Sequence, residues 1–253
     1  MSHHKVEVRN LLFSYPDGHE ALKKISFTIL HGESVGIIGA NGAGKSTILM
    51  LLMGILYPDS GDVLVGDVHL TKKTLPMIRQ RLGMVFQNPD DQLFMTNVYD
   101  DVAFGPRNYR LDEKEVDSRV MNALDLVGIS DLKDRAPFRL SGGEKRAASI
   151  ACVLSMQPDI LIMDEPTLAL DPKARRRVIN LLNSFEHTKI ITSHDLDLVL
   201  ETCQRVIVVK DGVIAADGKA KEILTNRFLL DECGLELPLT IQSCPVCGSV
   251  KNI

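Results

Sequence analysis

The stretch that decides the fold is Gly39-Ala40-Asn41-Gly42-Ala43-Gly44-Lys45-Ser46-Thr47. It follows a continuously apolar run, Val35-Gly36-Ile37-Ile38, and precedes an apolar helical pattern that begins at Ile48. A buried strand, a glycine-rich loop ending in Lys-Ser-Thr and a helix are typical of a phosphate-binding P-loop. Glycines allow consecutive backbone N–H groups to point at a phosphate, and the N-terminus of the helix favours negative charge. The candidate phosphate-binding residues are Gly39, Asn41, Gly42, Gly44, Lys45, Ser46 and Thr47.

Outside this loop, short apolar runs alternate with helical patterns, which indicates an α/β domain with a largely parallel sheet. The runs expected to be strands are Val6–Val8, Ile25–Ile29, Val35–Ile38, Met84–Phe86, Ile160–Met163, Lys189–Thr192 and Val206–Val209. Residues 88–139 differ, because they are polar and charged and include a helical pattern over residues 112–127. We expect this segment to be a helical insertion between two halves of one nucleotide-binding core.

Two carboxylates follow the apolar run Ile160–Met163, namely Asp164 and Glu165. The carboxyl end of a buried parallel strand is the edge of the sheet at which ligands bind in such folds. Together with a P-loop, this pair predicts ATP hydrolysis. Asp164 would hold Mg²⁺ with Ser46, and Glu165 would act as the general base for the attacking water.

The composition excludes several other classes of protein. The chain has 253 residues, 25% of them charged and 45% hydrophobic, with a net charge of -4 and no basic tract, so we expect no nucleic-acid partner. The longest apolar run, Ile48–Leu56, contains Gly54 and is far shorter than the roughly 20 residues of a membrane span. Without an apolar signal region or a disulfide pattern, the sequence favours a reducing cytosolic environment.

Two adjacent glycines occur in a later segment, Leu140-Ser141-Gly142-Gly143-Glu144-Lys145-Arg146, which precedes Asp164. Its polar serine and glycines predict a capped helix N-terminus that could face an anion. The segment resembles the signature motif of ABC ATPases. Residues that match further motifs of that family occur before and after it, in the expected order. These matching residues are Tyr15, Gln87, Asp171 and His194.

The resemblance covers residues 5–225 and implies the ABC-type P-loop NTPase fold. This fold is α/β, with a mostly parallel core sheet, an antiparallel β subdomain and a helical subdomain. We therefore expect an ABC ATPase domain over residues 1–225, with the helical subdomain at about 88–139, and a tail over residues 226–253. The implied ligands are ATP and Mg²⁺, and the implied reaction is hydrolysis of ATP to ADP and phosphate.

The resemblance also implies a head-to-tail dimer, with two ATP molecules held between its subunits. In such a dimer Tyr15 stacks on adenine, and Gln87 senses Mg²⁺ and the attacking water. His194 holds the γ-phosphate and orients Glu165. Ser141 and Gly143 of the signature are implied to bind the partner's ATP. Asp171, which follows the signature in the chain, is also implied to bind ATP.

Residues 85–106 indicate the subgroup, through Gln87-Asn88-Pro89-Asp90-Asp91-Gln92 and the segment from Asn97 to Pro106. They resemble the matching part of cobalt-type, or energy-coupling-factor, ATPase subunits. The resemblance implies an importer of a transition-metal ion, such as cobalt or nickel, or of a vitamin. Residues 87–106 would then contact an integral membrane coupling protein, with a separate membrane subunit binding the substrate. The chain would lie at the cytoplasmic face of the membrane; the alternative is a soluble ABC ATPase acting on an assembly scaffold.

Two features depart from the family pattern or lie outside it. Leu168 is bulky where the family usually has a small residue before Asp171, and it lies near the expected contact between the two subunits. Either a homodimer or a heterodimer with a paralogue is therefore possible. The pair Cys244 and Cys247 supplies two of the four ligands of a structural zinc site. Two tails could complete a Zn²⁺ site in a dimer, and the alternative is a reduced tail without metal.

Overall fold

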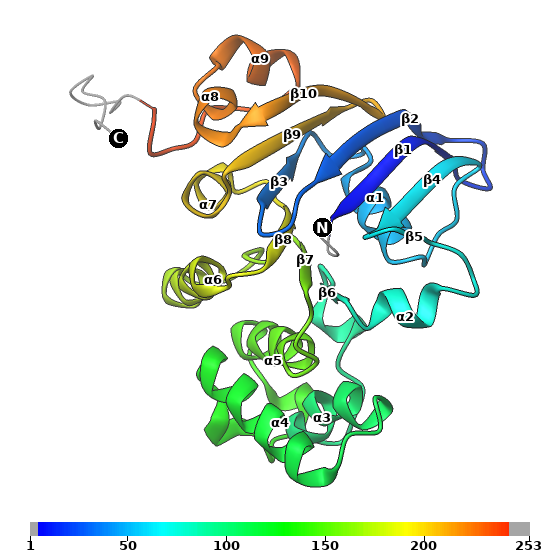
Figure 1. Ribbon diagram of the computed structural model, residues 1–253. Coiled ribbons are helices and arrows are strands. Elements are labelled where there is room, and N and C mark those ends of the chain that lie inside the picture. Colours follow the sequence, from blue (N-terminus) through cyan, green and yellow to red (C-terminus); the bar gives the residue numbers. More distant parts are fainter. Residues whose placement is uncertain (1–4, 243–253) are drawn as a thin grey trace. The chain divides into compact units, whose positions relative to one another are not determined.

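The computed structural model describes residues 5–242. By their internal contacts they form two compact units, one containing residues up to 78 and from 187 onward, the other containing residues 79–186. Figure 1 labels the helices and strands of both units in chain order. Within the described residues, no helix combines the length and the apolar character needed to span a membrane.

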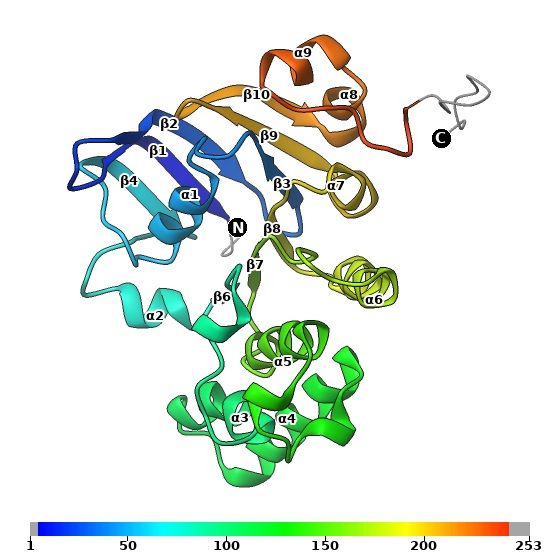
Figure 2. The same ribbon diagram turned by 180° about the vertical axis from the view of Figure 1, so that it is seen from behind.

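The first unit contains an antiparallel sheet with the strand order β2-β1-β4-β5. Its strands are β1 (Val6–Ser14), β2 (Glu20–Ile29), β4 (Ser60–Val65) and β5 (Val68–His69). Val8 of β1 lies opposite Phe27 of β2 and Val63 of β4, and Figure 2 shows β1 between these two strands. Val6 and Val8 are buried whereas Glu7 between them is not, as the period-two alternation predicts for a strand with one exposed face.

The same unit contains four strands with mostly parallel pairing. They are β3 (Ser34–Ile38), β8 (Thr188–Thr192), β9 (Arg205–Lys210) and β10 (Val213–Lys219). β3 pairs in parallel with β8 and with β9, and β10 pairs with β9 in the antiparallel direction. All five residues of β3 are buried, which fits its continuously apolar sequence. The loop that follows β3 therefore starts from a strand held on both sides.

Short helices complete the first unit. They are α1 (Lys45–Leu52), α2 (Leu75–Arg79, at the boundary between the units), α7 (Leu196–Thr202), α8 (Ala220–Leu224) and α9 (Arg227–Glu232). Beyond α9, the backbone N–H groups of Leu239 and Thr240 each donate to the Asp197 carboxylate of α7 at 3.0 Å. These bonds attach the last described residues to the first turn of α7.

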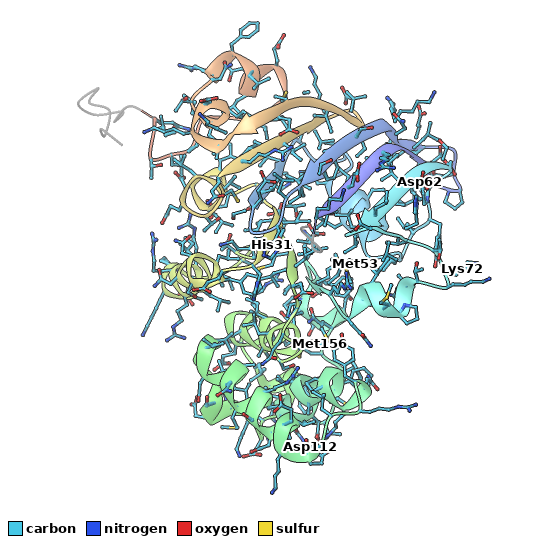
Figure 3. The ribbon with its side chains drawn as sticks, viewed as in Figure 1. His31, Met53, Asp62, Lys72, Asp112 and Met156 are labelled. Atoms are coloured by element: carbon cyan, nitrogen blue, oxygen red, sulfur yellow. The ribbon has the colours of Figure 1, made fainter. Side chains whose placement is uncertain are left out.

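The second unit contains a parallel strand pair and most of the helices. The strands are β6 (Leu82–Val85) and β7 (Ile160–Asp164), with Leu82 opposite Ile160. The helices are η1 (Pro89–Asp91), α3 (Val98–Asn108), α4 (Glu113–Val127), η2 (Ser130–Leu132), η3 (Pro137–Arg139), α5 (Gly142–Leu154) and α6 (Pro172–Ser184). Asp112, labelled in Figure 3, begins α4 by accepting bonds from the backbone N–H groups of Lys114 and Glu115.

Each apolar run that the sequence analysis assigned to a strand is a strand, although Phe86 lies just beyond β6. Strands β4, β5 and β10 were not predicted from the sequence. β10 is exposed or half-buried along its whole length, and β4 begins with Ser60-Gly61-Asp62, so neither has a clear apolar period. Helices α3 and α4 lie within residues 88–139, whereas the boundaries of the expected domain and tail stay a prediction.

The packing of β3 predicts the cost of adding one methyl group. A Cβ at Gly36 would lie 2.6 Å from Cγ1 of Val199. We therefore expect Gly36→Ala to lower the free energy of unfolding, measured by urea denaturation, by about 1–3 kcal/mol. Gly218→Ala is the matched control in β10, where the new Cβ would lie 3.6 Å from Ile223. Equal stability of the two variants would contradict the packing described for β3.

Candidate functional site

The P-loop of the first unit is built without room for side chains at two of its glycines. A Cβ at Gly39 would lie 2.2 Å from the backbone oxygen of Val209, and one at Gly44 would lie 2.8 Å from that of Ala21. Gly44 also has a φ of 106°, and it precedes α1 without a side-chain cap. Gly44 therefore places no side chain over the first backbone N–H groups of α1, and the N-terminus of a helix favours an anion.

The Lys45 ammonium group lies over the loop that it follows. Its Nζ donates to the backbone oxygens of Gly39 at 2.9 Å and Ala40 at 3.0 Å. The same atom lies 3.3 Å from Nε2 of His194, on the loop after β8. The structure thus brings together two predicted site residues that are 149 positions apart. Ser46 is half-buried beside Lys45, and Asn41 and Gly42 are exposed.

Tyr15, the residue expected to stack on adenine, lies next to α1. Its hydroxyl lies 3.0 Å from Oγ1 of Thr47, so this hydrogen bond connects the end of β1 to the first turn of α1. The ring of Phe13 contacts the Tyr15 ring edge-on, with centroids 5.0 Å apart. These two contacts fix the position of the Tyr15 ring relative to the P-loop.

In the second unit, Asp164 and Glu165 follow each other at the carboxyl end of β7, and both are buried. Glu165 has a φ of 48°, a left-handed conformation that is uncommon for a residue with a side chain. Such backbone strain concentrates at functional sites. The strained backbone at Glu165 therefore supports a functional role for this residue. Reasoning from the sequence had relied on its position directly after Asp164.

Gln87 leaves β6 in a segment that is held against α5. The buried guanidinium of Arg146 donates to the backbone oxygens of Phe86, at 2.6 Å, and of Gln87. Burial lowers the pKa of Arg146, and the charges of Asp164 and Glu165 act in the opposite direction. Two further contacts join this segment to α5, Lys145 Nζ to Asp90 Oδ1 at 2.6 Å and Gln92 Nε2 to the backbone oxygen of Ser149 at 2.8 Å.

Arg146 is a residue that the sequence analysis did not select. Its spacing of four positions from buried Ile150 places it on the buried face of α5. An arginine on the apolar face of a helix is unusual because a buried charge needs hydrogen-bond partners. A charged residue at an apolar position of the helical pattern was therefore the feature from which Arg146 could have been selected.

Ser141 and Asp171 both begin helices in the second unit. Ser141 and Glu144 form a capping box, in which Ser141 N donates to Glu144 Oε2 at 2.7 Å. Asp171 caps α6, and its pKa is lowered mainly because the backbone N–H of Ala174 donates to its carboxylate. A Cβ at Gly143 would lie 3.9 Å from Asp171 Oδ2, so the signature glycine and Asp171 are neighbours.

The sequence matches the family model described as ABC transporter over residues 22–168. The chain belongs to the ABC transporter family. A protein of Geobacter sulfurreducens named as an ABC transporter ATP-binding protein is 59% identical over 98% of this chain and 100% of its own length. The energy-coupling factor transporter ATP-binding protein EcfA of Carboxydothermus hydrogenoformans is 45% identical over 94% of this chain and 88% of its own length.

The structure is also similar to that of cbiO1 from Clostridium perfringens, described as part of the ABC transporter complex cbiONQ. The TM-score is 0.80 at 40% identity, over 90% of this chain and 94% of that one. The family and the ABC ATPase fold that the motifs predicted are thus confirmed. This ABC transporter protein is an ATP-binding subunit related to EcfA of the energy-coupling factor transporters and to cbiO1.

Two aromatic rings of this ABC subunit are exposed within residues 87–106. Phe94 is 63% exposed and Phe104 is 41% exposed, and they form an edge-to-face pair with centroids 5.0 Å apart. The buried carboxylate of Asp101 holds the backbone at Phe94, because it accepts hydrogen bonds from the N–H groups of Phe94 and Met95. Exposed aromatic residues held in fixed positions are typical of protein contact sites.

The remaining predictions concern Leu168 and the C-terminal cysteines. Leu168 is 50% exposed, and its effect on the partner subunit stays a prediction. Cys244 and Cys247 lie outside the described residues. Within residues 5–242, no group of three or more His, Cys, Asp or Glu side chains is arranged to hold a metal ion.

The contacts of Arg146 predict a specific loss of stability. Arg146→Met would leave the backbone oxygens of Phe86 and Gln87 without this donor, so we expect the free energy of unfolding to fall by about 1–3 kcal/mol. Lys145→Met is the control, because the Asp90 side chain with which it pairs is largely exposed and the pair should contribute at most about 1 kcal/mol. Urea denaturation of both variants measures the difference, and an equal effect would contradict the role given to Arg146.

Proposed function

We propose that this chain is the ATP-hydrolysing subunit of an importer of the energy-coupling-factor type, which takes up a transition-metal ion (cobalt or nickel) or a vitamin. The observation that carries the proposal is the P-loop in which Lys45 and His194 meet over Gly39 and Ala40. The likeness to cbiO1 of the cbiONQ complex and to EcfA supports this type of transporter.

The P-loop binds the phosphates of ATP. The β- and γ-phosphates are surrounded by backbone N–H groups of residues 39–44, including those of Asn41 and Gly42. Glycines leave no side chain between the backbone and its ligand. Lys45 places its positive charge on the same phosphates. The hydroxyl of Thr47 lies beside Tyr15, so the loop that binds phosphate also fixes the ring on which adenine stacks.

The residues expected to bind Mg²⁺ fit that ion. Ser46, Gln87 and Asp164 offer a hydroxyl, an amide and a carboxylate oxygen, and Mg²⁺ prefers oxygen ligands. The buried carboxylate of Asp164 would act on the ion through its water shell. When bound, Mg²⁺ neutralises charge on the phosphate oxygens during transfer.

Three side chains have roles in the hydrolytic step. Glu165 accepts a proton from the attacking water as the general base. His194 holds the γ-phosphate and orients Glu165, and its position beside Lys45 supports this role. Gln87 senses Mg²⁺ and the attacking water. The bonds from Arg146 to the backbone at Gln87 couple that residue to the helix of the signature motif.

A second ATPase subunit completes the site in this proposal. Ser141 and Gly143 act on the γ-phosphate of the partner's ATP, supported by a capped helix N-terminus whose Ser141 is exposed. Asp171, beside Gly143, is the further ATP-binding candidate. The partner is either a second copy of this chain or a paralogue.

The membrane partner is an integral coupling protein that contacts residues 87–106. The exposed pair of Phe94 and Phe104 supports this assignment, because a fixed aromatic patch suits an amphipathic helix end. A separate membrane subunit binds the substrate. The chain then works at the cytoplasmic face of the membrane, where its ATP hydrolysis drives uptake.

Replacing the general base tests the hydrolytic mechanism. We expect Glu165→Gln to lower kcat for ATP hydrolysis by about 100-fold or more, because a carboxamide does not accept the proton. ATP binding is retained, so the variant accumulates as an ATP-bound dimer visible by size-exclusion chromatography. Glu186→Gln, an exposed change in the same unit, is the control. Unchanged turnover in Glu165→Gln would remove Glu165 from this role.

Replacing the aromatic pair tests the contact with the membrane partner. In the native host, we expect the Phe94→Ser, Phe104→Ser double variant to move from the membrane fraction to the soluble fraction, because the docking surface loses its apolar rings. Phe228→Ser is the control, since Phe228 is 73% exposed but lies on α9. Immunoblots of both fractions give the result, and the thermal midpoint confirms folding. A double variant that stays in the membrane fraction like the control would contradict the assignment.

A further inference from the structure

The turn between β1 and β2 places a second aromatic ring beside Tyr15. The backbone N–H of Tyr15 donates to the oxygen of His19 at 2.8 Å, and the N–H of Gly18 donates to the oxygen of Tyr15 at 2.9 Å. The N–H of His19 donates to Oδ1 of Asp17 at 3.0 Å. These bonds fix the backbone at both ends of the turn, and hence the side from which the His19 ring approaches Tyr15.

The two rings are nearly parallel. Their planes differ by 11° and their centroids lie 6.4 Å apart. The Tyr15 ring is held by Phe13 and Thr47, whereas His19 is exposed. One ring of the pair is therefore fixed and the other is free to adjust by rotation of its side chain.

Two nearly parallel ring faces can hold a planar group between them once the exposed ring has moved aside to admit it. Carbon atoms in contact prefer about 3.5–4 Å, so a flat base between two parallel rings needs about 7 Å between the ring planes. Rotation of the exposed His19 side chain is the movement that opens this space. The fixed bond from Tyr15 to Thr47 keeps the opening next to α1 and the P-loop.

We propose that His19 is the second face of a clip in which Tyr15 and His19 hold the base of the nucleotide between them. The proposal rests on the proposed binding of ATP at the P-loop and adds a residue to it. Stacking acts on the face of a base and does not read its hydrogen-bonding edge. The clip therefore accepts adenine and guanine alike, and it favours a purine over the smaller ring of a pyrimidine.

Removing the imidazole tests the clip. His19→Ala loses one stacking contact with the base, so it raises the Kd for ATP about tenfold in isothermal titration calorimetry. His19→Phe restores a flat ring and returns the Kd toward that of the natural protein. The preference for ATP over CTP falls in His19→Ala, an effect that a general loss of structure would not produce.

Inorganic tripolyphosphate is the probe that separates the clip from the P-loop. It has no base, so its Kd stays the same in His19→Ala. His69→Ala is the matched control, an exposed imidazole on β5 paired with Asp62, which Figure 3 labels on β4. We expect this variant to bind ATP as the natural protein does.

Two results would overturn the clip. One is an unchanged ATP affinity in His19→Ala; the other is an equal weakening of ATP and tripolyphosphate, which would assign the effect to the P-loop. Failure of the proposed function is distinguishable from either result. In that case the natural protein would bind neither ATP nor tripolyphosphate, and the clip would be rejected with it.

Discussion

The close packing of the P-loop glycines against neighbouring backbone is the constraint on which the rest of this structure depends. Gly39 lies against the backbone of Val209 on β9, and Gly44 against that of Ala21 on β2. Strands from both sheets of the first unit thus fix the two ends of the loop. The Lys45 ammonium group also donates to the backbone of the loop, so contacts within the chain hold the loop in shape. A loop held in this way loses less entropy when it binds a ligand.

A comparable attachment in the second unit joins the segment that follows β6 to α5. The segment from Phe86 to Gln92 carries Gln87 and is joined to α5 by the side chains of Arg146, Lys145 and Gln92. A displacement of this segment therefore acts on the helix of the signature motif. The exposed pair of Phe94 and Phe104 follows in the chain, so the same segment connects Gln87, for which we propose a catalytic role, to the surface proposed for the membrane partner.

The sequence predicted the fold where physical chemistry left few alternatives. The continuously apolar runs at β3, β7 and β8 predict buried strands. The residue spacing identified the P-loop, and the resemblance of the signature and the other motifs identified the family. The strands β4 and β10 were missed because antiparallel pairing, not an apolar period, defines them. Arg146 and His19 were missed for a related reason: each is given its role by a contact with a residue distant in sequence or across a turn, and no local pattern encodes that contact.

The central claim is that this ATP-binding subunit energises a membrane importer, and co-purification from the native host tests it most directly. The tagged chain is isolated in a mild detergent, and the retained proteins are identified by mass spectrometry. The account predicts a small multi-helix membrane protein in a fixed ratio to the ATPase, together with a second, substrate-binding membrane subunit whose identity narrows the cargo. Recovery of the chain in a soluble complex, with no membrane protein, would contradict the account.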